Sequence, residues 1–406
     1  MKARYRYRCY PTKCQQLALS KLFGCVRRVW NDTLAYCIEE YKVGNKKPKN
    51  ADLQKRFITQ AKKTKDREWL KEVSNIPLQQ SLNDLEQAYQ NFFKSCKGQR
   101  KGKPVRPPKF KKRRAKQSAR FRQGGFKVHE NSVYLAKVGK LKIVWSRELP
   151  VAPSSVTVIR DSAGRYFLSF VVEIALDSLP ETNSNVGIDL GIKTFATLSN
   201  GEKIDAPKPL KKSIQRLRRL SKNLSKKTRG SKRYERARIR KAKLQAKLKD
   251  TRGDFLHKLS TQIINENQVI VLEDLNVSGM MKNRKLSRAI SDLGWRQFRT
   301  LLEAKAAKYG REFQVISRWE PTSKVCSFCG KRAGKLDLSI REWICLNCET
   351  THDRDINAAK NILVAGGHSD TLNGRGGKRQ TSVKEAAPCE TSTRPEFIQL
   401  SINEIA

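Results

Sequence analysis

Four cysteines in two pairs are the residues of this sequence whose types and spacing define a chemistry most clearly. Cys326 and Cys329 form one Cys-x2-Cys pair, Cys345 and Cys348 form another, and fifteen residues separate the pairs. Two such pairs supply four thiolates to one tetrahedral zinc ion. Because four sulfurs close the coordination shell and leave no position for water, we predict a structural zinc that folds a small module and does not catalyse.

Three carboxylates form a second candidate site. Asp189 lies in the apolar string VGIDLGIK, Glu273 ends the apolar run VIVLE, and Asp355 lies in THDRDINAAKNIL ahead of helix-forming residues. A carboxylate that interrupts a buried strand is costly unless something compensates it. If the three segments are neighbours, the carboxylates meet at one edge of a sheet and offer the oxygen ligands that Mg²⁺ or Mn²⁺ prefers. Paired ions of this kind catalyse phosphodiester hydrolysis.

Each acidic position also has a structural explanation that the sequence leaves open. An aspartate at the end of a strand often caps a helix or stabilises a turn. Asp274 follows Glu273 directly and is the alternative metal ligand. We prefer Glu273 because strand alternation directs only one of the two side chains inward. His352, beside Asp353, is either a proton shuttle or an exposed surface histidine, and we expect the surface histidine.

The balance of charges points to a polyanionic partner. The 406 residues include 85 Lys and Arg against 38 Asp and Glu, which gives a formal net charge of +47. Such a surplus, spread over a whole chain, repels itself unless a polyanion neutralises it, and nucleic acid is the first candidate. An anionic membrane would require an amphipathic basic helix or a lipid anchor, and neither is visible in the sequence.

Two segments concentrate this charge. Residues 97–122 contain thirteen Lys and Arg, no acid and three prolines, and residues 208–252 contain twenty Lys and Arg against two acids. Phe110 and Phe121 lie among the first set of cations, where bases could stack on them. The alternatives are a solvated linker for the first segment and a solvated helical hairpin for the second. We predict phosphate contacts for Lys111, Lys112, Arg113, Arg216, Arg218 and Arg219.

The elements expected to position these groups fall into two halves. The first half opens with a strand that alternates Tyr and Arg, continues with helices over 11–96, and has further strands over 126–176 that would complete a small β-barrel. The second half alternates strands and helices, which is typical of an α/β core. Its expected strands are 185–191, 194–200, 268–275 and 313–318, and its expected helices are two within 208–252 with a break at 228–231, then 255–266 and 295–309.

Several classes of protein are disfavoured. No apolar signal-peptide core follows the first charges, and the most apolar stretches are far shorter than a membrane span. Ten cysteines are sparse in a chain of this length, and the five N-terminal ones have no repeated spacing. A reducing compartment fits this usage best.

The motifs, taken in order, resemble a known family. GIDLGIK, LEDL, the four-cysteine pattern and DRDINAAKNI, with a long basic insert between the first two, resemble the split RuvC nuclease of the TnpB family. These proteins are encoded by insertion sequences and are related to the type V CRISPR effectors. The resemblance extends upstream, where Leu78-Gln79-Gln80 through Phe93 is similar to the family's LQ...NFF helix and Pro107 to Lys111 is similar to its P.F(K/R) segment. It covers roughly residues 1–370.

This resemblance implies an α+β multidomain architecture. An RNase H-like (RuvC) α/β nuclease core would carry a zinc-ribbon insertion, and an N-terminal wedge-like β-barrel would be interrupted by a helical recognition lobe. The implied divisions are the wedge (1–10 and 97–180), the recognition lobe (11–96), the first nuclease part (181–320) with the basic insert 208–252, the zinc module (321–350), the second nuclease part (351–369) and a disordered tail (370–406).

The resemblance also implies a function. It predicts a transposon-encoded, RNA-guided endonuclease that cleaves double-stranded DNA beside a short motif, with a guide RNA transcribed from the transposon end. Asp189, Glu273 and Asp355 would be catalytic and bind Mg²⁺ or Mn²⁺, one zinc would be structural, and one monomer would bind each RNA. We expect a cytoplasmic prokaryotic location, at the nucleoid when DNA is bound. The residues at the motif-reading positions are Asn75, Ile76, Gln79, Arg122 and Gln123.

Three alternatives stay open. A nuclease-silent RNA-guided repressor would bind its target without cutting, and a compact type V CRISPR effector would share the same motifs. A transposase would join DNA ends without any guide. Abundant Lys and Arg with few base-reading side chains suit a protein that leaves sequence reading to guide pairing.

Overall fold

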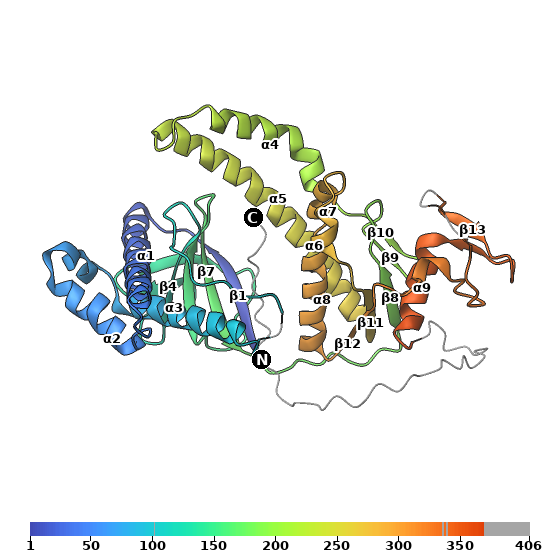
Figure 1. Cartoon of the computed structure of the whole chain (residues 1–406), viewed down its shortest axis with the longest axis horizontal. Coiled ribbons are helices and arrows are strands. Elements are labelled where there is room, and N and C mark those ends of the chain that lie inside the picture. The colour runs from blue at the N-terminus through green and yellow to red at the C-terminus, as the bar shows by residue number, and fades with distance from the viewer. Residues whose placement is uncertain (101, 335–336, 338–339, 369–406) are drawn as a thin grey trace. The chain divides into compact units, whose positions relative to one another are not determined.

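The computed structural model describes residues 1–368 apart from 101, 335–336 and 338–339 (Figure 1). The expected tail at 370–406 lies outside these residues. The chain separates into an N-terminal unit, Lys2–Ile174, and a C-terminal unit that begins at Ala175. Among the described helices, none combines the length and apolar character that a membrane crossing requires.

An antiparallel sheet organises the N-terminal unit. Its strands follow the order β2-β6-β7-β1-β5-β4-β3, so the first strand of the chain lies between two later ones. Tyr7 and Cys9 of β1 point into the core, as their alternation with arginines predicts. The strands are β1 (Lys2–Cys9), β2 (Gln117–Arg122), β3 (Phe126–Val128), β4 (Ser132–Leu135), β5 (Gly139–Val144), β6 (Ser155–Arg160) and β7 (Tyr166–Glu173).

The predicted closed barrel is not found. Residues 123–125 alone separate β2 from β3 in sequence, yet these strands stand at opposite ends of the hydrogen-bonded order, and no ladder joins them within the described residues. Helical side chains pack at this bend instead: Ile76 Cδ1 lies 2.9 Å from the position that a Cβ on Gly125 would take. The strand pattern alone did not reveal this packing of a helical side chain at the bend.

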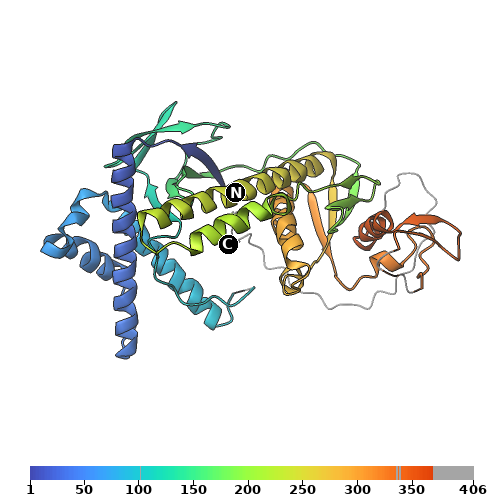
Figure 2. The ribbon, with the colours of Figure 1, turned by 90° about the horizontal axis from the view of Figure 1, so that it is seen from above.

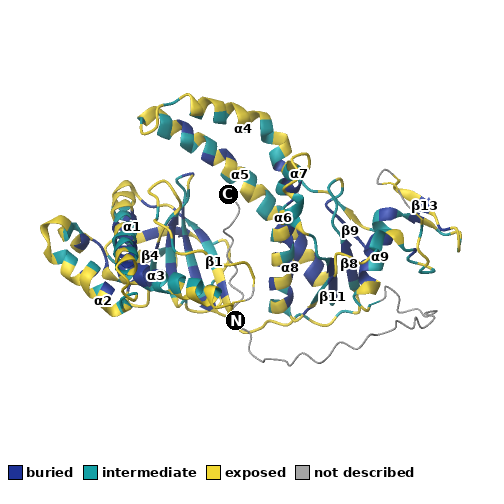
Figure 3. Cartoon of the chain, in the orientation of Figure 1, coloured by how far each residue is buried: buried dark blue, intermediate teal, exposed yellow. Residues whose placement is uncertain are grey.

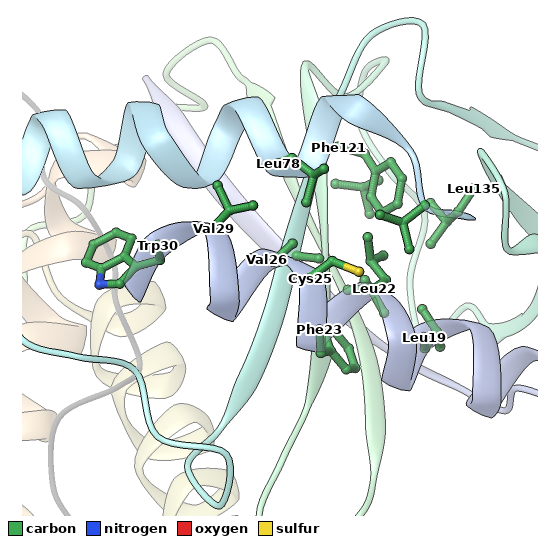
Figure 4. Packing of buried hydrophobic residues seen from close by; sticks show 14 of the residues in the cluster. Leu19, Leu22, Phe23, Cys25, Val26, Val29, Trp30, Leu78, Phe121 and Leu135 are labelled. Carbon is green, nitrogen blue, oxygen red and sulfur yellow. The ribbon is translucent and has the colours of Figure 1, made fainter. Parts of the chain in front are cut away.

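The helices and the sheet of this unit share one hydrophobic core. Leu19, Leu22 and Leu78 from the helices pack with Phe121 and Leu135 from the strands (Figure 4). A capping box between Thr12 and Gln15 starts the first helix. The expected helical stretch consists of α1 (Lys13–Lys42), α2 (Asn50–Gln54), the short helices η1 (Lys55–Gln60), η2 (Ala61–Lys63) and η3 (Lys65–Glu72), and α3 (Asn75–Cys96).

Strand β2 lies inside the basic segment 97–122, where no strand was expected. Alternation in QSARFR directs Ala119 and Phe121 inward, and Phe121 is fully buried. The idea that Phe121 stacks on bases is therefore wrong, because its ring belongs to the core. Phe110 remains about half exposed.

A mixed sheet organises the C-terminal unit, in the order β10-β9-β8-β11-β12. β8, β11 and β12 run parallel, whereas β9 and β10 pair antiparallel. The strands are β8 (Asn185–Asp189), β9 (Ala196–Leu198), β10 (Lys203–Ile204), β11 (Val269–Glu273) and β12 (Glu312–Ile316). This sheet confirms the expected α/β half, including the buried strand at 268–275.

Helices cover both faces of this sheet (Figure 1). Ile188 and Ile270 pack against the helices of one face, whereas Val271 packs against Ile362 and Leu363 on the other. Strand alternation thus divides the apolar side chains between two layers. The first face carries the C-terminal half of α5 (Lys232–Glu266), α6 (Val277–Met280), α7 (Ser287–Leu293) and α8 (Trp295–Tyr309), and the second face carries α9 (Arg354–Ala365).

Helix α9 approaches the sheet very closely at one glycine. A Cβ built on Gly187 of β8 would lie 2.1 Å from the backbone oxygen of Ala359 and 2.8 Å from the backbone nitrogen of Leu363. Only a residue without a side chain fits between strand and helix at this distance. The contact fixes where α9 begins relative to the end of β8.

The basic insert forms a hairpin of α4 (Pro209–Ser225) and the N-terminal half of α5, which run side by side (Figure 2). Much of α4 is exposed, whereas Leu244 and Ala237 of α5 are buried (Figure 3). Asp292 of α7 accepts hydrogen bonds from the backbone nitrogens of Leu210 and Lys211 and so caps α4. The two predicted helices are confirmed, but α5 continues without a break into the helix expected at 255–266.

Candidate active site and zinc centre

The parallel strands β8 and β11 end beside each other with a carboxylate at each end. Leu272 pairs with Ile188, so Glu273 and Asp189 follow at adjacent positions. Asp355 lies in the first turn of α9, which the contact at Gly187 places across β8. The three predicted carboxylates therefore come from distant segments to one edge of the sheet.

These carboxylates influence one another. Burial, together with the nearby charges of Asp355 and Glu273, raises the pKa of Asp189 from its ordinary value to about 7. Burial also raises the pKa of Glu273; adjacent Asp274 adds to this rise and Arg318 opposes it. Crowded, desolvated carboxylates of this kind are typical of functional sites, because a bound cation relieves their mutual repulsion.

Asp274 is committed to ion pairs. Its carboxylate contacts Arg299 of α8 at 2.5 Å and also contacts Arg318, which follows β12. Hydrogen bonds from Arg299 and Arg318 hold the pKa of Asp274 below its ordinary value. This arrangement supports Glu273, and not Asp274, as the carboxylate that is available for a metal.

The start of α9 is fixed by Asp353. Its carboxylate caps the helix by accepting hydrogen bonds at 3.0 Å from the backbone nitrogens of Asp355 and Ile356, and it pairs with Lys203 of β10 at 2.5 Å. The Asp355 carboxylate pairs with Arg341 at 3.1 Å. Sequence reasoning missed Arg341, which lies fourteen residues before Asp355 and belongs to none of the motifs considered.

The three carboxylates fit a divalent ion by chemistry and location, but they are not drawn tightly together. Within the described residues, the four cysteines are the only group of three or more Cys, His, Asp or Glu whose ligand atoms gather within reach of one ion. Arg341 meanwhile supplies a positive charge to Asp355. Hard carboxylate oxygens favour Mg²⁺ or Mn²⁺ over softer ions.

The four cysteines meet as their spacing predicts. Their sulfurs all lie within 4.8 Å of one another, and the Cys326–Cys348 and Cys329–Cys345 pairs are each 3.6 Å apart. Tetrahedral zinc with bonds of about 2.3 Å would place its sulfurs about 3.8 Å apart. A hydrogen bond from the backbone of Lys331 lowers the pKa of Cys329 to about 6, which favours the thiolate. This donor set fits one structural zinc.

His352 is buried beside this cluster, so the expected exposed histidine is wrong. It lies on β14 (Thr351–Asp353) opposite Trp343 of β13 (Glu342–Ile344), with the two rings 4.7 Å apart. His352 Nε2 is 3.0 Å from Cys326 Sγ. Burial lowers the pKa of His352. The short hairpin that buries it was not expected, because each strand has only three residues.

Polar residues of α9 attach the zinc module to the helix that carries Asp355. Asn357 accepts a hydrogen bond from Ser327 and donates one to Val325, each at 2.8 Å. Asn361 donates to the same Val325 oxygen at 2.6 Å. Sequence reasoning missed these residues, although two asparagines four positions apart on one helix face were the available signal.

The predicted phosphate contacts divide into two groups. Arg216, Arg218 and Arg219 on α4 are exposed, as are Lys112 and Arg113. Lys111 differs, because its Nζ lies 3.7 Å from the centre of the Trp30 ring and burial lowers its pKa to about 8. Hydrogen bonds between Asn31 and the Lys111 backbone hold this segment along α1. Lys111 therefore anchors its own segment.

The predicted motif-reading residues lie near one another. Asn75, Ile76 and Gln79 occupy the first two turns of α3, and Arg122 and Gln123 lie at the end of β2. The close approach of Ile76 to Gly125 joins the two sets. All of these residues are exposed except Ile76, which is partly buried.

Comparison with known proteins identifies the family. Family models match residues 1–46 ("Helix-turn-helix domain"), 169–284 ("Probable transposase") and 295–362 ("Cas12f1-like, TNB domain"). A Streptomyces pristinaespiralis protein named "Putative RNA-guided DNA endonuclease" is 44% identical over 375 residues, which cover 90% of each chain. The chain belongs to the TnpB family. An Escherichia coli member named "Putative RNA-guided DNA endonuclease InsQ" is 31% identical over 89% of this TnpB chain and 92% of its own.

A "TnpB-like protein" of Acanthamoeba polyphaga mimivirus is 25% identical over 89% of this chain and 72% of its own. Among solved structures, Cas12f1 in a complex with guide RNA and target DNA superposes with a TM-score of 0.52 and 17% identity, covering 86% of this chain and 82% of that one. The structural likeness supports the fold of this TnpB protein. The model that matches residues 1–46 is named a helix-turn-helix domain, but in this structure these residues form strand β1 followed by the single long helix α1.

Proposed function

We propose that this TnpB protein is an RNA-guided endonuclease of a transposable element that cleaves double-stranded DNA beside a short motif. The observation that carries the proposal is the position of Asp189, Glu273 and Asp355 at one edge of the mixed sheet. Family membership and the formal charge of +47 support it. The order of strands in the sheet suits an RNase H-like, RuvC-type core.

In this proposal, Asp189, Glu273 and Asp355 hold divalent ions, with Mg²⁺ or Mn²⁺ as the matching hard cations. Such ions, when bound in pairs, stabilise the attacking and leaving oxygens of an in-line phosphodiester displacement. The chain contributes the fixed ends of β8 and β11 and the capped start of α9. Asp189 must give up its proton before it can act as a ligand.

The basic surfaces are assigned to the guide and target. Arg216, Arg218 and Arg219 on the hairpin, with Lys112 and Arg113, would neutralise phosphates without reading bases. The guide RNA, drawn from the transposon end, would read the target sequence by pairing. Asn75, Gln79 and Arg122, which the structure leaves exposed around Ile76, would read the short motif in the DNA duplex.

The test is cleavage of a matched plasmid by the purified ribonucleoprotein in Mg²⁺. Asp189→Asn, Glu273→Gln and Asp355→Asn should each abolish cleavage while target binding persists, because guide pairing and metal binding use different residues. Asp254→Asn is a matched control, since among the residues that the structure describes this exposed aspartate of α5 forms an ion pair only with Lys258 of the same helix. Target binding without cleavage by the unaltered protein would favour a guided repressor. Strand joining without a guide would favour a transposase.

A further inference from the structure

Asp274 is a carboxylate beside the proposed active site that the proposed mechanism does not use. It follows Glu273 directly, and each of its oxygens is occupied. Arg299 Nη1 lies 2.5 Å from Oδ1, and Arg318 contacts Oδ2. The backbone nitrogen of Asp274 also donates to Ile316 at the end of β12. Asp274 thus connects the ends of β11 and β12 with α8.

The two arginines differ in their relation to Glu273. Arg318 lies two residues after Ile316, the β12 residue that pairs with Glu273, whereas Arg299 lies on helix α8. The charge of Arg318 also opposes the rise in the pKa of Glu273. The side chains of Asp274 and Arg318 are 32% and 37% exposed, so the arginine has room to rotate if its partner is lost. A guanidinium that paired with Glu273 would occupy oxygens that a divalent cation requires.

We propose that Asp274 is a positioning residue that holds Arg318 away from Glu273 and thereby keeps this carboxylate free for a divalent cation. The inference rests on the proposed function, because it assumes that Glu273 is a metal ligand. It predicts that loss of Asp274 weakens binding of the divalent cation only when Arg318 is present.

Mn²⁺ binding measures this dependence without relying on cleavage. The full-length, zinc-loaded and RNA-free chain is titrated with Mn²⁺ and followed by electron paramagnetic resonance, with the Glu273→Gln variant as the background. Asp274→Asn should weaken Mn²⁺ binding about tenfold, the range typical of residues that support metal ligands. Asp274→Asn combined with Arg318→Gln should return to within about threefold of the unaltered chain. Asp254→Asn should leave binding unchanged.

A matched double variant separates this role from a general effect of charge. Asp274→Asn with Arg299→Gln removes the same charges but leaves Arg318, and it should stay weak. Unchanged binding in Asp274→Asn, equal recovery in both double variants, or no recovery with Arg318→Gln would each overturn the proposal. Should Asp274→Asn fail to fold, Arg318→Gln alone decides: binding at least as tight as the unaltered chain supports the inference, and weaker binding overturns it. Equal Mn²⁺ binding by the unaltered chain and Glu273→Gln would instead overturn the proposed metal site itself, and this inference with it.

Discussion

At the residue scale, Asp189 should make two properties depend on pH. Its pKa is raised to about 7, mainly by burial. Between about pH 4 and pH 7, the Asp189 carboxyl is therefore protonated in the folded, metal-free chain but ionised in the unfolded chain. Stability in this window should therefore fall as pH rises, by up to about 1.4 kcal/mol per pH unit from this group. Denaturant unfolding in EDTA at several pH values measures the slope.

Asp189→Asn should remove that part of the slope. Because the ligand must be ionised, Mn²⁺ affinity of the unaltered chain should also weaken as pH falls below about 7. Stability that rises between pH 4 and pH 7, with the same slope in Asp189→Asn, would contradict the assignment.

The sequence located the residues with strong local patterns and missed those defined by distant contacts. The cysteine spacing and the carboxylates in apolar strands were visible because each pattern lies within a few residues. Arg341 meets Asp355 only after the β13–β14 hairpin forms, and the Lys111 ammonium lies over Trp30, about eighty positions earlier in the chain. Such contacts depend on the tertiary fold, which local patterns do not encode.

At the element scale, the contact between β8 and α9 should tolerate no side chain. Gly187→Ala would place a methyl group against the backbone of α9, which should cost at least about 1–3 kcal/mol and displace Asp355. The thermal unfolding temperature and the rate of plasmid cleavage should both decrease. Gly253→Ala is the matched control, because a Cβ in α5 at that position meets nothing closer than 4.0 Å. A Gly187→Ala variant with full stability and activity would show that the helix can move without loss.

The zinc module should respond differently to two kinds of metal removal. Mild EDTA should strip the carboxylate site but leave about one zinc per chain, so Mg²⁺ alone should restore cleavage. Cys345→Ser should lose the zinc and also reduce cleavage, because Asn357 and Asn361 attach the module to α9. Cys14→Ser, at an exposed cysteine of α1, should change neither quantity. Elemental analysis checks the zinc, and a need for added zinc after mild EDTA would contradict a purely structural role.

Secondary structure was predictable where the hydrophobic periodicity extended over many residues. The prediction failed where tertiary packing determined the structure. The helices of 11–96 and most strands of both sheets follow their patterns, whereas β2 and β10 were not expected. β2 was hidden by the charge of its neighbours, and the sheet does not close into a barrel, with Ile76 of α3 packed at the bend between β2 and β3. The helix expected separately at 255–266 is the C-terminal part of α5, which runs without interruption from Lys232 to Glu266.

At the scale of the whole molecule, the hairpin cations should govern how binding depends on salt. Reversal of Arg216, Arg218 and Arg219 to Glu should weaken nucleic-acid binding equally for unrelated guides. It should also reduce the slope of log K against log salt by about two to three. Filter binding over a salt series, with two guide sequences, measures both effects. A loss confined to one guide sequence would show that these arginines read bases.

The unbroken course of α5 has a consequence for how this chain can change in length. The helix begins beside α4 and ends against the sheet that carries Asp189 and Glu273. The direction in which the hairpin faces therefore depends on the number of residues in α5. Each inserted residue would advance the helix by about 1.5 Å and turn the hairpin by about 100° around the axis. Removal of seven residues, close to two full turns, would shorten α5 by about 10 Å and leave the hairpin facing the same way. Viable insertions should therefore fall in the loop at 226–231, whereas changes within α5 should come in whole turns.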